Sequence, residues 1–318
     1  MSALPNLREL HGRFVISRPQ VMDMRCAFPA LQEISTQDTD QQTRGCFLAV
    51  LPLISSRSLT RLSLRISVPL AEDMVKYLDE LCSSPATAQL RTLDLSVDIE
   101  FNQFDNQWEP FEGVSFASDV LAPLKRLSSA LTDVSAVVCF QTSTVATFTI
   151  ADGDLDAAAR AWPGLARAKF GYTIEFDDSH DGAWGIVRPS LSAVVALAER
   201  CRALERVDVE FESVGAGELA RLEARADACT EPQTALRRIV FDPDSDFCDT
   251  FCVEDPVRLA EALGRLFPNL RSGLEMVETE PEGETTVAYR GWHRSRMDTD
   301  AFWLLKALDE CSLFYNVM

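Results

Sequence analysis

The stretch WPGLARAKF, residues 162–170, has near copies elsewhere in the chain. FPALQEIST occupies residues 28–36, FPNLRSGLE occupies residues 267–275, and LPNLRELHG occupies residues 4–12. Proline cannot continue a helix, because it lacks an amide hydrogen and its ring clashes with the preceding turn. We therefore interpret each copy as a helix end followed by a tight turn, with the aromatic residue and the leucine directed into the same interior.

The leucine of these copies opens a wider pattern, Leu-x-x-apolar-x-apolar, that recurs along the chain. Its openings are Leu7, Leu31, Leu59, Leu90, Leu131, Leu165, Leu204 and Leu236, with a looser ninth copy at Leu270. Successive openings are separated by 24 to 41 residues. A persistent period of this length is typical of repeat proteins, in which each unit covers the apolar flank of its neighbour.

Each copy ends in a strand pattern, and most copies follow a helix pattern. Within residues 207–211, apolar and acidic residues alternate, as expected for a half-buried strand. Residues 152–162 form the clearest helix, with Asp152 placed to cap its first amides. Two more helices are predicted to begin near Pro189 and Pro256, because proline fits the first helical position.

These units predict an α/β fold, namely a leucine-rich-repeat solenoid (horseshoe) with a parallel sheet on the concave side and helices on the convex side. We interpret residues 1–318 as a single domain of about nine irregular repeats. Residues 285–318 are predicted to cap its C-terminus, with a last strand in residues 285–292 and a helix in residues 301–308.

Composition restricts the function before any motif is considered. The formal net charge of −19 predicts an acidic surface that repels nucleic acid and favours a partner with a basic surface. The sequence contains neither a signal-peptide pattern nor an apolar stretch that could cross a bilayer, so we expect an intracellular protein, cytoplasmic or nuclear, with no membrane partner. Its nine cysteines form no disulfide framework, and Cys82, Cys201 and Cys311 fall on apolar helical faces, which predicts buried reduced thiols.

Three segments share a detailed helix, turn and strand signature. They are Phe148-Thr-Ile150-x-Asp152-x-Asp154-Leu155 running into Ala161-Trp162-Pro163-x-Leu165, Leu197-Ala-x-x-Cys201-x-x-Leu204 running into Val207-x-Val209-x-Phe211, and Asp255-Pro256-Val257 with Leu263 and Phe267-Pro268-Asn269-Leu270. Over most of its length the chain resembles the repeat region of fungal F-box/leucine-rich-repeat proteins. The resemblance implies that the repeats hold the substrate of a ubiquitin ligase, whereas an N-terminal F-box docks on a Skp-type adaptor.

The chain departs from that family at its start. No F-box precedes the first repeat, which the chain enters at Leu4-Pro5. We expect that upstream sequence is missing, and a Skp-type adaptor is a predicted partner only if an F-box exists there. The alternative is a leucine-rich-repeat scaffold or regulator unrelated to ubiquitin.

Three long connections, residues 102–118, 177–188 and 242–255, leave the carboxyl ends of predicted strands and therefore emerge at one edge. Their aromatic and acidic residues predict a rim that binds a basic protein. The predicted partner-binding residues are Asp105, Trp108, Phe111, Asp177, Asp178, Trp184, Asp242, Asp244 and Phe247. The same aromatic residues could instead cover the ends of their own strands.

The inner face of the predicted strands is a second candidate surface. Its charged residues are Arg61, Arg65, Asp94, Asp98, Arg167, Lys169, Arg206 and Asp208. Their mixed signs are equally typical of a solvated sheet surface.

Motifs for catalysis or cofactor binding are weak. Residues 215–220, with Gly215 and Gly217, match a dinucleotide-binding turn and make an NAD(P)-dependent enzyme an alternative. The preceding strand, however, alternates with acids, whereas a first Rossmann strand is apolar on both faces. Residues 242–246 begin like a calcium loop, but Phe247 stands where glycine is needed. We therefore predict a recognition module without enzymatic activity, cofactor or metal.

Overall fold

The computed structural model of the chain describes residues 6–13, 28–38, 47–48, 51, 54, 58–68, 70–100, 113–141, 147–175, 185–240, 253–270, 276–279 and 286–289. The chain divides into two compact units, Met1–Val187 and Arg188–Met318. Each unit combines parallel strands with helices, which confirms the predicted α/β class.

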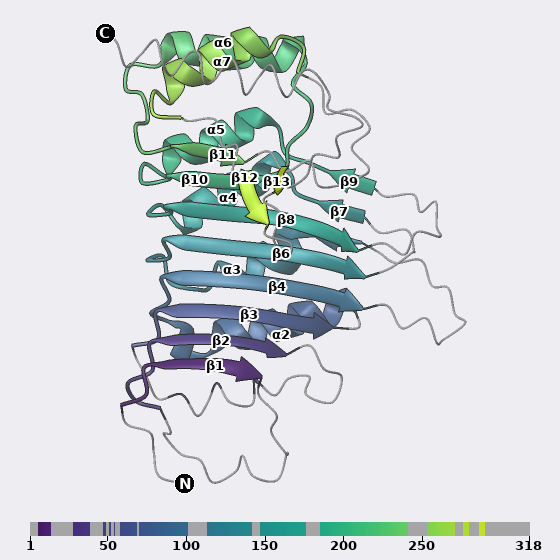
Figure 1. Cartoon of the computed structure of the whole chain (residues 1–318), viewed down its shortest axis with the longest axis vertical. Helices are drawn as coiled ribbons and strands as arrows, with labels where there is room; N and C mark the ends of the chain where they lie inside the picture. Colours follow the sequence, from purple (N-terminus) through teal and green to yellow (C-terminus); the bar gives the residue numbers. More distant parts are fainter. Residues whose placement is uncertain are drawn as a thin grey trace, which may run out of the picture. The chain divides into compact units, whose positions relative to one another are not determined.

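The main strands of the first unit form a parallel sheet and lie side by side in chain order (Figure 1). The short strands of this unit belong to a separate sheet, which is described below. In spatial order these strands are β1 (Glu9–Arg13), β2 (Glu33–Asp38), β3 (Arg61–Val68), β4 (Thr92–Glu100), β6 (Asp133–Gln141) and β8 (Arg167–Glu175). Adjacent members all pair in parallel, so the intervening chain must return along one side of the sheet.

Helices and a second small sheet supply that return path. The helical segments are α2 (Ala71–Ser83), η3 (Pro85–Thr87), η4 (Phe116–Leu121), α3 (Ala122–Leu124) and α4 (Asp152–Ala161). In the view of Figure 1, α2 and α3 lie behind the strands. The small sheet joins β5 (Val114–Ser115), β7 (Thr147–Thr149) and β9 (Gly185–Val187), again in parallel.

The second unit repeats the alternation of helix and strand. Its elements are α5 (Leu191–Arg200), β10 (Arg206–Val209), α6 (Ala216–Ala228), β11 (Arg238–Val240), α7 (Pro256–Leu266), β12 (Met276–Thr279) and β13 (Thr286–Tyr289). β10 and β11 pair in parallel, and Val214 forms an isolated parallel bridge with Val253. None of the described helices is long and apolar enough to span a membrane.

The strand register aligns the positions that the repeat pattern identifies as equivalent. Three residues after each opening leucine, the paired positions across the first unit are Leu10, Ile34, Leu62, Leu93, Val134 and Ala168. In the second unit, Val207 pairs with Ile239 in the same way. The alignment read from the sequence is therefore confirmed for eight strands.

Neighbouring repeats are joined by the same hydrogen bonds at the start of each strand. The carbonyl of Thr60 accepts hydrogen bonds from the amides of Arg91 and Thr92, at 2.8 and 3.0 Å. The carbonyls of Arg8, Gln32, Arg91, Thr132 and Glu205 accept two amides of the next strand in the same manner. This shared geometry sets the register before the strand pairs begin.

The turns between helix and strand explain the repeated aromatic-Pro-x-Leu phrase. Trp162 ends α4 by donating its amide to Ala158 at 2.9 Å, and its own carbonyl accepts the Leu165 amide at 3.1 Å. Phe267 and Leu270 repeat this pattern after α7. Trp162 and Leu165 are fully buried, whereas Pro163 is exposed. The aromatic residue and the leucine are thus both delivered into the core, as predicted.

The core of the first unit is aliphatic near the start of the strands and aromatic near their carboxyl ends. Phe116 lies 5.2 Å from Phe170, and Phe148 lies 5.2 Å from Tyr172, measured between ring centroids. The small sheet closes tightly over this end. Gly113 has a φ of +65°, and a side chain there would approach the Thr147 carbonyl oxygen to 2.8 Å, so this position requires glycine.

Helix starts differ in detail from the sequence prediction. α5 is capped by Ser190, whose hydroxyl accepts the Ala193 amide at 3.2 Å, so Pro189 lies one residue outside the cap. α4 starts at Asp152, but the carboxylate that accepts the Ala151 amide, at 2.8 Å, belongs to Asp154. Only Pro256 occupies the predicted first position of its helix.

The long connections and the C-terminal strand also differ from expectation. Part of each predicted loop forms secondary structure, because β5 and the start of η4 lie within residues 102–118, β9 within 177–188, and the Val253 bridge within 242–255. β13 falls within the predicted last strand but pairs antiparallel with β12 in a sheet of their own. The predicted terminal helix, residues 301–308, lies outside the described residues.

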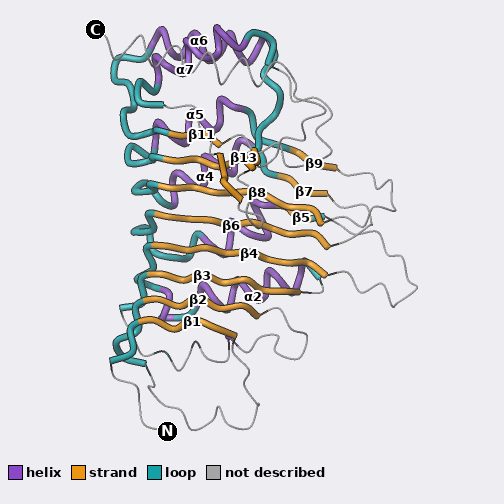
Figure 2. Tube along the Cα trace, in the orientation of Figure 1, coloured by secondary structure: helices purple, strands orange, loops and turns teal. Residues whose placement is uncertain are grey.

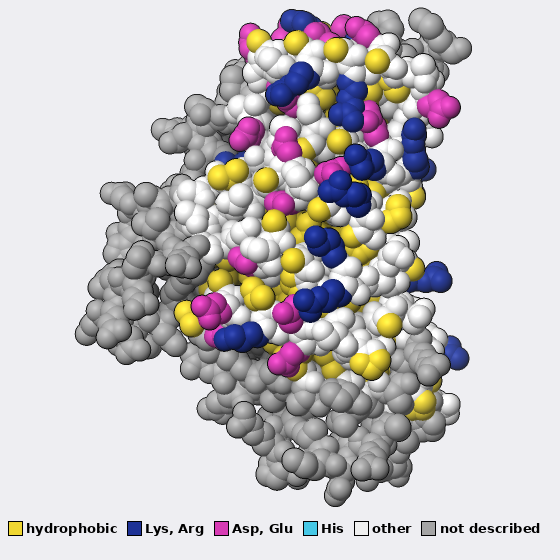
Figure 3. Space-filling model, turned by 180° about the vertical axis from the view of Figure 1, so that it is seen from behind, with side chains coloured by type: hydrophobic (Ala, Val, Ile, Leu, Met, Phe, Trp, Pro, Cys, Tyr) yellow, Lys and Arg dark blue, Asp and Glu magenta, His cyan; other side chains and the backbone are white. Residues whose placement is uncertain are grey.

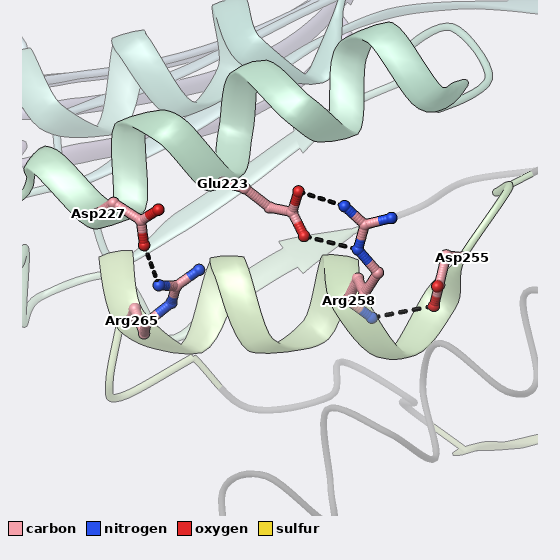
Figure 4. Close-up of polar contacts among 5 residues, drawn as sticks. All are labelled: Glu223, Asp227, Asp255, Arg258 and Arg265. Carbon is pink, nitrogen blue, oxygen red and sulfur yellow. Dashed lines mark hydrogen bonds and ion pairs between the residues drawn. The ribbon is translucent and has the colours of Figure 1, made fainter.

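Arginines connect α6 to α5 and α7 to α6 in the second unit. Arg258 of α7 donates two hydrogen bonds to Glu223 of α6, at 2.7 and 2.5 Å, and Arg265 pairs with Asp227 (Figure 4). Arg225 of α6 donates to Glu199 of α5 at 2.9 Å. The hydrogen bonds to Glu223, and then its charge, raise the pKa of Arg258. Viewed from behind the strands, basic and acidic side chains are interspersed rather than separated by sign (Figure 3).

Candidate functional site

The predicted partner-binding rim cannot be assessed from the described residues. Asp105, Trp108, Phe111, Asp177, Asp178, Trp184, Asp242, Asp244 and Phe247 all lie outside them. The structure does describe where these connections begin. β4, β8 and β11 end at Glu100, Glu175 and Val240, and within the first unit β4 and β8 run parallel on either side of β6.

The second candidate surface is described in the first unit, where it covers the side of the sheet opposite the core. We call it the polar sheet face and define it by four rows of residues across β3, β4, β6 and β8. From the amino to the carboxyl ends of the strands, the rows are Arg61-Thr92-Asp133-Arg167, Ser63-Asp94-Ser135-Lys169, Arg65-Ser96-Val137-Gly171 and Ser67-Asp98-Cys139-Thr173.

Alternation along the strands produces this face. In β3, Leu62, Leu64 and Ile66 are buried in the core, whereas the intervening Arg61 and Arg65 are exposed. Six of the eight charged residues predicted for the inner face therefore lie together here: Arg61, Arg65, Asp94, Asp98, Arg167 and Lys169. The remaining two, Arg206 and Asp208, belong to β10 of the second unit, where their side chains lie 3.5 Å apart.

Charges on the polar sheet face are largely compensated between adjacent strands. Arg61 lies 3.3 Å from Glu33 of β2, and Arg167 pairs with Asp133 of β6. Both arginine side chains are more than half exposed, so these pairs contribute little to stability. The face thus offers a pattern of hydrogen-bonding groups rather than a strong field of one sign.

Small side chains lie between the charged side chains of the polar sheet face. Ser63, Ser96, Ser135 and Gly171 are all half-buried, and Ser63 donates a hydrogen bond to Asp94 at 3.2 Å. Because these residues project little, a polypeptide could approach the strands closely and reach the flanking charges. This arrangement is suited to binding an extended or flat protein surface.

Two residues of the fourth row are buried, although the sequence pattern is typical of a solvated sheet surface. Asp98 and Ser67 are only 2% exposed, although both point away from the apolar core. Arg65 Nε donates to Asp98 Oδ2 at 2.7 Å, and the carboxylate itself is 3% exposed. The alternation of the sequence identified the face of Asp98 but gave no signal for its burial.

Cys139 lies beside Asp98 in the same row. Its sulfur is 3.6 Å from the Ser96 hydroxyl. Burial raises the pKa of Cys139, and the neighbouring carboxylate of Asp98 raises it further, although hydrogen bonds from Thr173 and Ser96 oppose the shift. The thiol therefore stays protonated at neutral pH, which is unfavourable for nucleophilic catalysis.

The two glycines of the dinucleotide-like motif have ordinary backbone geometry. Gly215 is the N-cap of α6, with a φ of −82°, and Gly217 lies in the first turn. An added side chain at either position would meet no atom within 4 Å. Neither position therefore requires glycine for packing within the protein.

Other features concern metals and thiols. Within the described ranges, no group of three His, Cys, Asp or Glu residues is placed to hold a metal ion. The calcium-like residues 242–246 lie outside those ranges. Cys82 and Cys201 are buried free thiols, as predicted, and Cys311 is outside the described residues.

Comparisons with known proteins do not assign the chain to a family. No protein-family model, no curated protein and no solved structure matches it.

Proposed function

We propose that the protein is a leucine-rich-repeat solenoid that recognises another protein through its polar sheet face and the connections that follow β4 and β8 in the first unit, with the connection that follows β11 in the second unit as a further candidate surface. The observation that supports this proposal best is the strand register. It aligns one polar position from each repeat into continuous rows, and stacked repeats of this kind commonly present their strands as a binding surface.

Charge identifies the kind of partner. The segments 101–112, 176–184 and 241–252 contain ten Asp or Glu residues and no Lys or Arg. Acidic residues concentrated beyond the carboxyl ends of three strands would attract a partner with a basic surface and increase its association rate. The aromatic residues of the same segments, including Trp108 and Trp184, are the residue types that dominate protein interfaces.

The resemblance to fungal F-box/leucine-rich-repeat proteins suggests a biological setting for this recognition. In that setting the repeats hold a substrate for ubiquitylation, and a Skp-type adaptor is a partner only if the protein also carries an F-box. A scaffold that shares the repeat architecture but has no ligase partner is the alternative. Co-purification of the adaptor with a chain extended by its natural upstream sequence would support the ligase role, and its absence would favour the scaffold.

The recognition surface itself can be tested by charge reversal. Proximity labelling in the native cell would first identify a direct partner, and binding of the purified pair would then be measured by calorimetry. We expect Asp178→Lys to weaken binding about tenfold and to make it less sensitive to salt, because a rim acid steers and attracts a basic partner.

The matched control is Glu72→Lys, which makes the same charge change on α2, where the Glu72 side chain is 82% exposed. It should leave affinity within about twofold of the wild-type value. Equal affinities for wild type, Asp178→Lys and analogous variants of the other two connections would exclude this rim as the binding surface.

A further inference from the structure

In the fourth row of the polar sheet face, two buried polar atoms lack a hydrogen-bond partner within the described chain. Ser67 and Asp98 are direct register partners on β3 and β4, near the carboxyl ends of the strands. Both are 2% exposed, yet neither belongs to the apolar core, which occupies the other side of these strands. Buried polar atoms in proteins nearly always have hydrogen-bond partners.

Two atoms of this pair have none. Asp98 Oδ2 accepts a hydrogen bond from Arg65, but within the described chain Asp98 Oδ1 and Ser67 Oγ have no hydrogen-bond partner. Cys139, on the other side of Asp98, contributes at most a weak thiol hydrogen bond to the carboxylate, which leaves Asp98 Oδ1 without a strong donor. An ionised carboxylate oxygen without a donor is unfavourable in a buried position, so this site would gain from any strong donor that reached it.

The surroundings indicate which donor fits. Arg65 compensates only one carboxylate oxygen, and a carboxylate can accept a second charged donor at the other. The connections that leave β4 and β8 beyond this row, residues 101–112 and 176–184, contribute six acidic residues and no basic residue. A cationic donor would therefore meet attraction from both the row and its flanking sequence.

We propose that Asp98, supported by Ser67, is the anchor that accepts the ammonium or guanidinium group of a lysine or arginine side chain of the protein partner. The inference rests on the proposed function and adds the residue that determines specificity. The incoming group donates to Asp98 Oδ1 and to Ser67 Oγ, while Oδ2 keeps its bond to Arg65. Such a buried, charge-assisted contact within a mixed-charge face has the properties of an interface hot spot.

The test uses the full chain and synthetic nonapeptides with randomised flanks and a central Lys, Arg or Gln. Binding would be measured by fluorescence polarisation for the wild type, Asp98→Asn and Asp79→Asn. Asp79→Asn is the matched control, because it also removes a carboxylate paired with an arginine, Arg126 at 3.0 Å, but from α2. We expect the wild type and Asp79→Asn to prefer central Lys or Arg over Gln by at least about tenfold, and Asp98→Asn to lose that preference.

A second readout separates the anchor from a general effect on folding. Bound Lys peptide should raise the midpoint of thermal unfolding above the value with the Gln peptide in the wild type and in Asp79→Asn, but not in Asp98→Asn, because a ligand stabilises only a folded state that binds it. This difference between peptides decides the matter if Asp98→Asn is less stable than the wild type. Ser67→Ala should weaken the Lys preference partially.

The outcomes distinguish the two proposals. A Lys or Arg preference that persists in Asp98→Asn, with the same midpoint shift as in the wild type, overturns the anchor but leaves the proposed recognition of a basic partner intact. That result would mean that a bound water satisfies Asp98. If the wild type binds none of the peptides, both the anchor and the basic-partner proposal fail.

Discussion

Single buried leucines in the strands contribute much of the stability of each repeat. Leu93 is 1% exposed and lies between Leu62 and Val134 in the register of the first sheet. Leu93→Ala should reduce the free energy of unfolding by about 2 to 5 kcal/mol, because the neighbouring strands cannot collapse into the cavity. Guanidinium denaturation would measure the change. Leu70→Ala, at a side chain that is 53% exposed, should cost less than about 0.5 kcal/mol, and equal effects would contradict the burial pattern.

Cys82 allows a prediction of pH dependence. Burial raises the pKa of this thiol from 9.0 to about 12, because the thiolate would be desolvated. A pKa that is higher in the folded than in the unfolded state means that the associated stability is complete below pH 9 and is lost as the pH rises towards 12. Cys82→Ala should therefore lose less stability than the wild type over that range.

Alkylation provides the direct measurement. At pH 9, iodoacetamide should modify half-buried Cys229 and spare Cys82 in the folded protein, whereas both should react in denaturant. Rapid modification of folded Cys82 would show that its thiol is accessible.

At the residue scale, the sequence predicted buried leucines well and buried polar groups poorly. Ile34, Leu62 and Leu93 fall at equivalent buried positions because the pattern of apolar residues directly encodes which side of a strand is covered. Asp98 has the same alternation as exposed Asp94, and only the neighbours supplied by adjacent strands distinguish the two.

Among the elements, α7 depends on a side-chain cap at its start. Asp255 accepts the Arg258 amide at 3.1 Å, and Pro256 occupies the first helical position (Figure 4). Asp255→Ala should lower the free energy of unfolding by about 1 kcal/mol, because the amide loses its acceptor. Chemical denaturation with Glu254→Ala as the control would measure this, since adjacent Glu254 is exposed. Indistinguishable variants would argue against a capping role.

Elements were predictable in proportion to their length. The main strands and α4, α5 and α7 carry enough residues for a period to be recognised. β5, β7 and β9 have only two or three residues each, too few to display alternation, and we therefore interpreted the sequences of β5 and β9 as loop and predicted no strand at β7. A signal was nevertheless present, because an apolar residue such as Phe148 or Val253 precedes each helix by a few positions.

At the scale of the whole molecule, the repeat period predicted the α/β class of the fold, because each repeat pairs its strand with those of the repeats next to it in the sequence. Six parallel strands in the first unit, in an order that follows the chain, are the expected result of stacking like units (Figure 2). The horseshoe curvature remains a prediction, since it depends on small rotations between units that no sequence pattern encodes. The candidate site divides similarly: the polar sheet face is described, whereas the aromatic and acidic rim remains a prediction from composition.

The turns that lead into the strands have one further consequence. From Trp162 to Leu165, and again from Cys201 to Leu204 and from Phe267 to Leu270, the chain takes three residues and one carbonyl-to-amide bond to pass from helix to strand. After α4 and α5 this step brings in the next strand at the same distance from the helix end, whereas longer segments follow α2 and α6. Between repeats that share the step, differences in length therefore arise after the strands. Insertions and substitutions can accumulate on that side while pairing on the other side is preserved. A scaffold organised in this way can acquire new binding specificities during evolution, or by loop grafting in the laboratory, without redesign of its framework.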